Sequence, residues 1–132
     1  MDLLAATDGS VPVVFDRLHW EANPRSASYE AELGEALRSW PRGRVAELHY
    51  SEQAEGKPRG AHAEYVTGRG LLRFLQEVAE IAAGREVVVI VEAKKKDIAI
   101  TRAIAELSPR LHAKLRAIVP DLARSSISAA PA

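Results

Sequence analysis

Short apolar runs alternate with longer amphipathic stretches along this chain, a pattern typical of strands that alternate with helices. Val11–Phe15 is continuously apolar, so we expect a strand that is buried on both faces. Glu86–Val91 predicts a second buried strand, the strongest of the chain. Val45–His49 predicts a third, weaker strand, because it includes Glu47. Apolar residues at helical spacing predict helices over about Tyr29–Trp40, about Gly70–Ala83, from Asp97 onward, and over about Leu111–Ala123.

Turn-forming residues mark the ends of these elements. Asp16–Ser28 predicts a long polar loop with Asn23-Pro24 as a breaker, and Ser51–Gly60 predicts a surface loop. Gly84 is well placed to end the second helix, and Pro109 is expected to close or kink the third. These signals divide the chain into three strand–helix units.

The order of the elements predicts an α/β fold. Crossovers of this length imply parallel strands with helices packed outside them, and such sheets bind ligands at the carboxyl ends of their strands. Three units are too few for a complete eight-stranded barrel, which needs about 250 residues, and Met1–Leu4 resembles the last turn of a helix whose beginning is missing. We therefore expect a partial TIM (β/α) barrel with about three parallel βα units from its carboxyl-terminal half. It would form a single domain over residues 1–124, with a disordered tail over 125–132.

Composition narrows the chemistry. Lys plus Arg (18) equals Asp plus Glu (18), so the whole-chain charge predicts no polyanion partner, although a local basic patch could bind one. The absence of cysteine excludes disulfides and thiolate metal sites, which leaves His and carboxylate ligands for Mn, Fe, Zn or Mg. No apolar run approaches the roughly 20 residues of a membrane span, and no signal peptide is evident, so we expect a cytoplasmic protein without membrane contact.

Each predicted strand delivers residues of metal-ligand type to its carboxyl end. Asp16 and His19 follow the first strand, His49 ends the second and Glu92 follows the third, while His62 lies across the loop after the second. Carboxylate and neutral imidazole are the ligands of hard and borderline divalent metals. Other interpretations remain open: either histidine could be an ordinary core or surface residue. Glu92 could pair with Lys94 or Lys95, and Asp16 with Arg17.

Several nearby residues could contact nucleic acid. Lys94-Lys95-Lys96 is either a solvated loop and helix start or a set of phosphate contacts beside the metal site. Trp20 and Tyr50 could stack on bases or simply pack, with packing favoured for Trp20. His112 lies in the last predicted helix, away from any strand end, and is interpreted as structural.

Four segments in this order, residues 11–20, 48–52, 61–66 and 91–97, resemble the second half of the UV-damage endonucleases. The resemblance covers about Leu3–Leu107. It implies a xylose-isomerase-like barrel that nicks damaged double-stranded DNA on the 5′ side of UV photoproducts with a cluster of divalent metals, typically manganese. On that basis the metal ligands would be Asp16, His19, His49, His62 and Glu92.

The chain departs from the family at three places. Leu18 stands where the family often has a further histidine, so we expect a less polar rim. The family's first strands supply further His and Glu ligands that this sequence does not carry before Met1. The family also has a carbamylated lysine two positions before the strand-end histidine, and Glu47 stands there. Glu47 keeps the charge type with a shorter reach, so we expect it to bridge metals in a shifted geometry.

Three hypotheses follow. The leading one is a truncated UV-damage DNA endonuclease homologue that hydrolyses phosphodiester bonds with Mn²⁺, with Lys94 and Lys95 at the phosphate. A partner chain or a homodimer would complete its barrel. The second is a sugar isomerase-like metal enzyme on the same kind of barrel. The third is a non-catalytic remnant or DNA-binding subunit of a split barrel.

Overall fold

The computed structural model describes residues 10–23 and 27–120. The helix end predicted at residues 1–4 and the tail predicted at 125–132 lie outside the described residues. The elements are β1 (Phe15–Asp16), α2 (Arg17–Ala22), α3 (Tyr29–Ser39), β2 (Ala46–Tyr50), α4 (Gly68–Ala82), β3 (Val87–Val91), α5 (Lys96–Ala105) and α6 (Pro109–Ile118).

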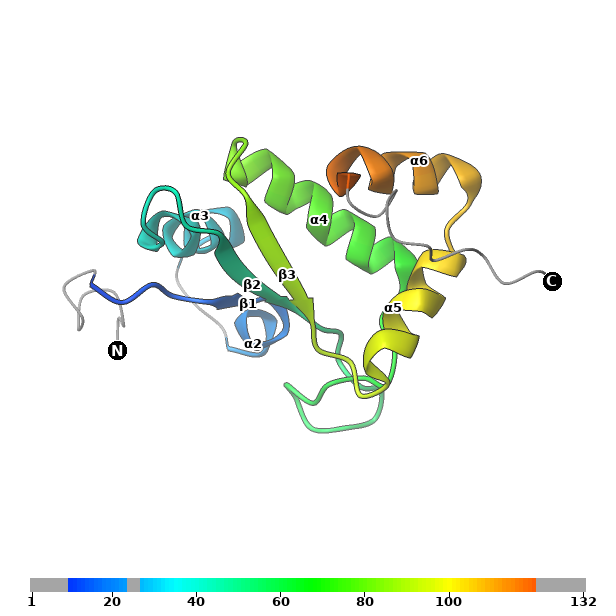
Figure 1. Ribbon diagram of the computed structural model, residues 1–132. Helices are drawn as coiled ribbons and strands as arrows, with labels where there is room; N and C mark the ends of the chain where they lie inside the picture. The colour runs from blue at the N-terminus through cyan, green and yellow to red at the C-terminus, as the bar shows by residue number, and fades with distance from the viewer. Residues whose placement is uncertain (1–9, 24–26, 121–132) are drawn as a thin grey trace.

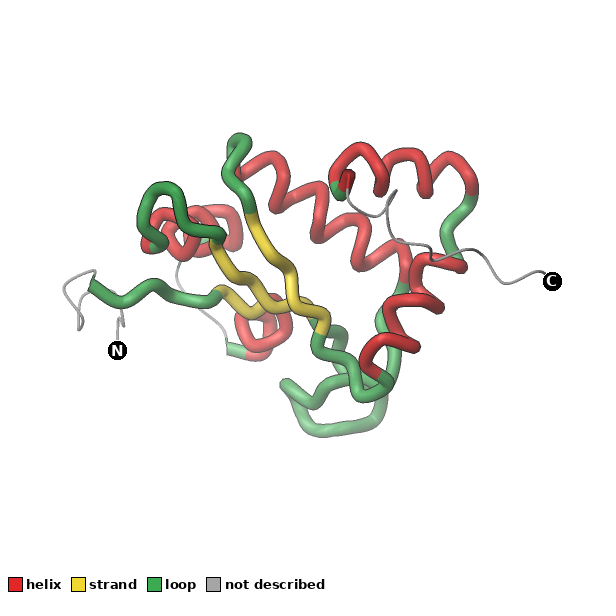
Figure 2. The backbone as a smooth tube through the Cα atoms, in the orientation of Figure 1, coloured by secondary structure: helices red, strands yellow, loops and turns green. Residues whose placement is uncertain are grey.

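The three strands form one parallel sheet in the order β1-β2-β3 (Figures 1 and 2). Asp16 lies opposite His49, and the β2–β3 ladder runs from Ala46 opposite Val87 to Tyr50 opposite Val91. Helices connect the strands and return the chain to the same end of the sheet, as parallel pairing requires. The predicted α/β fold with three parallel strands is confirmed.

Helices α3 and α4 cover one face of this sheet (Figure 1). Ala46, Leu48 and Tyr50 alternate along β2 and point into that helical layer, because successive side chains of a strand project to opposite faces. The fully buried side chains of Leu33 in α3 and Phe74 in α4 lie in the same core. A second apolar cluster joins α4 to α5 and α6 through Leu72, Ile104, Leu107 and Leu115.

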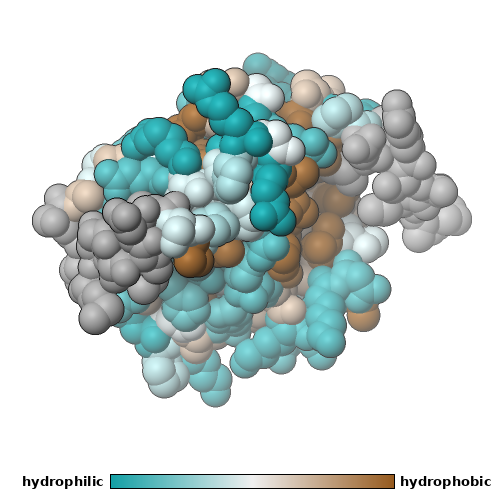
Figure 3. All heavy atoms as spheres, turned by 60° about the vertical axis from the view of Figure 1, so that its left-hand side comes forward, coloured by the Kyte–Doolittle hydropathy of each residue, from teal (hydrophilic) through white to brown (hydrophobic). Residues whose placement is uncertain are grey.

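The opposite face of the sheet is open within the described residues. Val88 is 44% exposed and Ile90 is 39% exposed, so the prediction of a buried strand is wrong for this face of β3. Its sequence is apolar throughout, but among the described elements a helical layer covers only the face of Val87, Val89 and Val91. Figure 3 shows one side of the molecule, where brown apolar atoms lie among teal polar ones.

The first strand is shorter than the predicted Val11–Phe15, because only Phe15 of that range, together with Asp16, pairs with β2. Val11 and Val14 are exposed, so the prediction that this strand is buried on both faces is wrong. Side chains at the end of α3 take the place of a strand partner. Ser39 Oγ accepts a hydrogen bond from the backbone N–H of Val13 at 2.8 Å, and Trp40 Nε1 donates to the carbonyl oxygen of Val13 at 3.0 Å. The backbone N–H and C=O groups of Val13 therefore have partners without a sheet ladder.

The region predicted as a loop after the first strand contains the helix α2. Asp16 caps it by accepting a hydrogen bond from His19 N at 2.9 Å, and Leu18 is buried. The helix ends at Ala22, and Asn23, the first residue of the predicted breaker, is its C-cap. The loop prediction is therefore wrong for Arg17–Ala22.

Gly84 and Pro109, which the sequence marks as helix ends, both have clear structural roles. Gly84 has a φ of +83°, the left-handed conformation that commonly ends a helix, and it follows α4 as predicted. The prediction that Pro109 closes or kinks the preceding helix is wrong, because Pro109 occupies the first turn of α6. Proline is favoured there because the first helical N–H groups have no acceptor within the helix.

Truncating a side chain should change the free energy of unfolding by different amounts on the two faces of the sheet. Leu48→Ala should lower the free energy of unfolding by about 2–5 kcal/mol, because Leu48 is fully buried. Val88→Ala, on the neighbouring strand and the open face, should change it by less than about 0.5 kcal/mol. Urea unfolding followed by circular dichroism measures both. Equal losses would mean that the face of Val88 is buried in solution.

Candidate metal centre

Parallel pairing brings the carboxyl ends of the three strands to one edge of the sheet. Asp16 ends β1, His49 lies near the end of β2, and Glu92 follows β3. One ligand atom from each of these three side chains lies within 4.8 Å of the other two, and all three residues are partly buried. Among the described residues this is the group of His and carboxylate side chains that could hold a metal ion. The sequence prediction that strand ends assemble these residues is therefore matched by the geometry.

The imidazole of His49 lies between two carboxylates. Its Nε2 atom is 3.0 Å from Oε1 of Glu47, and its Nδ1 atom is 3.4 Å from Oε2 of Glu92. The alternative pairing of Glu92 with Lys94 or Lys95 is not found within the described residues, where the ion-pair partner of Glu92 is His49. Glu92 is thus directed toward the candidate site and not toward the basic run.

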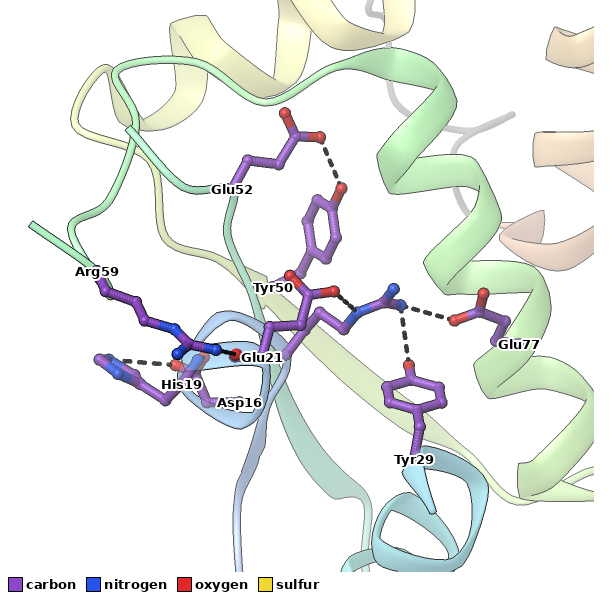
Figure 4. Close-up of polar contacts among 9 residues, drawn as sticks. Asp16, His19, Glu21, Tyr29, Tyr50, Glu52, Arg59 and Glu77 are labelled. Atoms are coloured by element: carbon purple, nitrogen blue, oxygen red, sulfur yellow. Dashed lines mark hydrogen bonds and ion pairs between the residues drawn. The ribbon is translucent and has the colours of Figure 1, made fainter. Parts of the chain in front are cut away.

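Asp16 performs two tasks with its two oxygens. Oδ1 accepts the hydrogen bond that caps α2, and Oδ2 lies 3.9 Å from Nε2 of His19 (Figure 4). The Asp-x-x-His spacing that suggested a metal site is therefore also the spacing of a helix cap. The cap fixes the direction of the Asp16 carboxylate and holds the largely exposed His19 ring at the same rim.

His62 reaches the site from the loop between β2 and α4. Its Nδ1 atom lies 3.1 Å from the carbonyl oxygen of Glu92, and its ring centroid is 5.6 Å from that of His19. A carbonyl oxygen can only accept, so Nδ1 carries the proton, and in the neutral ring Nε2 keeps a free lone pair. His19 and His62 therefore form a second group of imidazoles beside the first cluster.

Backbone hydrogen bonds fasten this loop to the end of β3. Lys94 N donates to Ala63 O at 3.1 Å, and Lys95 N donates to Glu64 O at 3.0 Å. On the other side, Arg59 Nη2 donates to the carbonyl oxygen of Glu21 at the end of α2 at 2.6 Å (Figure 4). The side chains of Lys94 and Lys95 are exposed. The two predicted phosphate-contacting lysines thus have fixed backbones and exposed side chains at the rim.

An arginine network that sequence reasoning missed supports the site from the helical side. Glu21, Tyr29 and Glu77 surround one guanidinium group in Figure 4, that of Arg17. Its Nε is 2.6 Å from Glu21 Oε1 and its Nη1 is 2.8 Å from Glu77 Oε2, which joins α2 to α4. Burial alone would lower the pKa of Arg17, but the hydrogen bond to Glu21 and the neighbouring charges raise it overall. Within the described part of the chain the carboxylate partners of Arg17 are Glu21 and Glu77, so the alternative pairing of Asp16 with Arg17 is not found there.

Neither aromatic residue considered for base stacking is free to stack. Tyr50 is buried and stacks on Phe74 at 5.0 Å, so the base-stacking interpretation of Tyr50 is wrong. Its hydroxyl donates to Glu52 at 2.7 Å, and burial followed by this hydrogen bond raises the pKa of Tyr50. Trp20 packs against Phe15 and Tyr29, as the packing interpretation predicted. Residue parity along β2 could have indicated that Tyr50 faces the core.

A parallel β/α sheet with imidazoles and carboxylates at its carboxyl edge defines an α/β domain with a candidate divalent-metal site. The family described as "UV-endonuclease UvdE" matches residues 2–120, so the chain belongs to this family. No helix among the described residues is long and apolar enough to cross a membrane.

Known relatives agree with this assignment. The UV DNA damage endonuclease of Bacillus velezensis is 31% identical over 100 residues, which cover 74% of this chain and 31% of the relative. That of Halalkalibacterium halodurans is 27% identical over 75% of this chain and 31% of the relative. The crystal structure of SacUVDE superposes with a TM-score of 0.60 at 29% identity, covering 76% of this chain and 32% of SacUVDE. The chain thus spans about a third of the length of these relatives.

Because Asp16 caps α2, substitutions at this residue should test the capping role in the absence of metal. Asp16→Asn should leave the free energy of unfolding within about 0.5 kcal/mol, since asparagine caps helices as well as aspartate does. Asp16→Ala should lower it by about 1 kcal/mol. Urea unfolding in the presence of a chelator measures both. If Asp16→Asn destabilised the protein as much as Asp16→Ala, the capping assignment would be incorrect.

Proposed function

We propose that this chain is a metal-binding part of a UV-damage DNA endonuclease, which hydrolyses a phosphodiester bond on the 5′ side of a UV photoproduct in double-stranded DNA. The observation that carries the proposal is the convergence of Asp16, His49 and Glu92 within 4.8 Å, in a chain that belongs to the UvdE family. The alternative of a sugar isomerase loses support, because the similar relatives are UV DNA damage endonucleases.

The donor set fits a divalent cation. Two ligands at about 2.0–2.2 Å from one ion lie about 3.0–3.5 Å apart, and His49 Nδ1 is 3.4 Å from Glu92 Oε2. Mixed imidazole and carboxylate donors suit manganese, the metal we propose. Asp16, His49 and Glu92 would hold one ion, and His19 and His62 would contribute beside it. Bound there, the ion would act as a Lewis acid toward the scissile phosphate.

The chain's own residues would orient the metal ligands and bind the DNA backbone. The α2 cap fixes Asp16, and the Glu92 carbonyl orients His62, so both ligands are aligned before a metal arrives. Lys94 and Lys95 extend from the rim directly after Glu92, where they would bind the negatively charged phosphates of the damaged strand. The role proposed for both lysines is electrostatic.

The open sheet face has a place in this proposal. A second polypeptide, either a partner chain or another copy of this one, would cover Val88 and Ile90 and complete a barrel. If the completed site binds metal without cutting DNA, the chain is instead a non-catalytic subunit. A nicking assay on UV-irradiated duplex DNA separates these two functions.

Metal affinity tests the ligand assignment. Glu92→Gln should weaken Mn²⁺ binding by about tenfold or more, because it removes an anionic ligand. Glu86→Gln is the matched control, since Glu86 is a carboxylate at the other end of the same strand. Isothermal titration calorimetry of chelator-treated protein measures both. Equal affinities in the two variants would contradict the assignment.

DNA binding tests the two lysines. Replacing Lys94 and Lys95 with alanine should weaken binding to UV-irradiated duplex DNA and make its salt dependence shallower, by a slope of about 0.9 for each phosphate that is no longer neutralised. Replacing Arg110 and Lys114 on α6 removes the same charge far from the strand ends in sequence and fold. Fluorescence anisotropy at several salt concentrations compares the pairs. If the salt dependence of DNA binding has the same slope in both double variants, Lys94 and Lys95 do not contact the DNA phosphates.

A further inference from the structure

We propose that Glu47 is a positioning residue, which holds the Nε2–H group of His49 and thereby directs Nδ1 to the metal. The inference rests on the proposed function, because it assigns a role within the same site. It also differs from the expectation that Glu47 bridges metals directly.

The sheet places Glu47 beside His49. The two residues are separated by one position on β2, so both project from the open face. Val88 lies opposite Glu47 in the ladder and offers no polar side-chain group. Within the described residues, the polar partner of the Glu47 carboxylate is the His49 ring.

The two distances around the imidazole differ in kind. The 3.0 Å between His49 Nε2 and Glu47 Oε1 is an ordinary hydrogen-bond length. The 3.4 Å between Nδ1 and Glu92 Oε2 is long for a hydrogen bond but typical of two ligands of one ion. Glu47 is also outside the group formed by Asp16, His49 and Glu92. The ring therefore presents Nε2 to Glu47 and Nδ1 to the metal cluster.

The single N–H group of a neutral imidazole leads to the same assignment of the two His49 nitrogens. A neutral imidazole has one N–H group and one lone pair, and an ionised carboxylate can only accept a hydrogen bond. If Glu47 accepts from Nε2–H, the lone pair is on Nδ1, which faces Glu92. Histidines that bind metals generally donate their other N–H to a carboxylate or carbonyl group, which fixes the ring and raises its basicity. Glu47 would provide this partner for His49, as the Glu92 carbonyl does for His62.

The first experiment determines the tautomer in the wild-type protein. Long-range ¹H–¹⁵N NMR spectra of the Zn²⁺-loaded chain should show His49 with a protonated Nε2 and a metal-bound Nδ1. Zn²⁺ is chosen because it is diamagnetic and accepts the same ligand types. Coordination of His49 through Nε2 would overturn the inference.

The second experiment uses Glu47→Gln and Glu47→Ala, with Glu86→Gln as the control at the other end of the sheet. All variants should bind the same number of Mn²⁺ ions per chain as the wild type. Affinity should fall about 10–100-fold for alanine and less for glutamine, whose amide oxygen can still accept from Nε2–H. Loss of one metal equivalent in Glu47→Gln would make Glu47 a ligand and overturn the inference. A wild-type chain that binds no metal would instead overturn the proposed function, and the inference with it.

Discussion

The register of the parallel sheet is the constraint on which the rest of this structure depends. Pairing of Asp16 with His49, and of Tyr50 with Val91, brings three strand ends level with one another. The same register assigns the faces, because Leu48 points into the helical core while His49 points to the open side. A slip of one residue in β2 would bury His49 and expose Leu48. Core packing of the apolar face thus fixes the position of the polar side chains.

Secondary contacts convert this alignment into directed side chains. The α2 cap holds one oxygen of Asp16, and Arg17 ties the same helix to α4 through Glu77. Backbone hydrogen bonds from Lys94 and Lys95 secure the loop that carries His62. Each of these candidate ligands is therefore held by a group that is not itself expected to bind the metal. Metal sites need this supporting layer, because an imidazole or carboxylate that rotates freely loses entropy on binding.

The sequence predicts much of this arrangement, and the exceptions have physical causes. Apolar runs and helical periodicity locate the strands and the long helices, and the strand-end rule selects Asp16, His49 and Glu92. The six-residue helix α2 escapes prediction, because it depends on one side-chain cap and one buried residue and not on a repeated apolar pattern. The exposure of β3 could not be predicted either, because an apolar strand has the same sequence whether or not a second layer covers it. Which nitrogen of His49 faces which carboxylate is set by tertiary distances that no spacing encodes.

The central claim is that the strand ends form a metal centre, and anomalous diffraction tests it most directly. Crystals of the chain grown with Mn²⁺ would be measured on both sides of the manganese absorption edge. The account predicts an anomalous peak in contact with Asp16, Glu92 and Nδ1 of His49, at about 2.0–2.3 Å from each donor. A peak elsewhere on the surface, or none at these side chains, would contradict it.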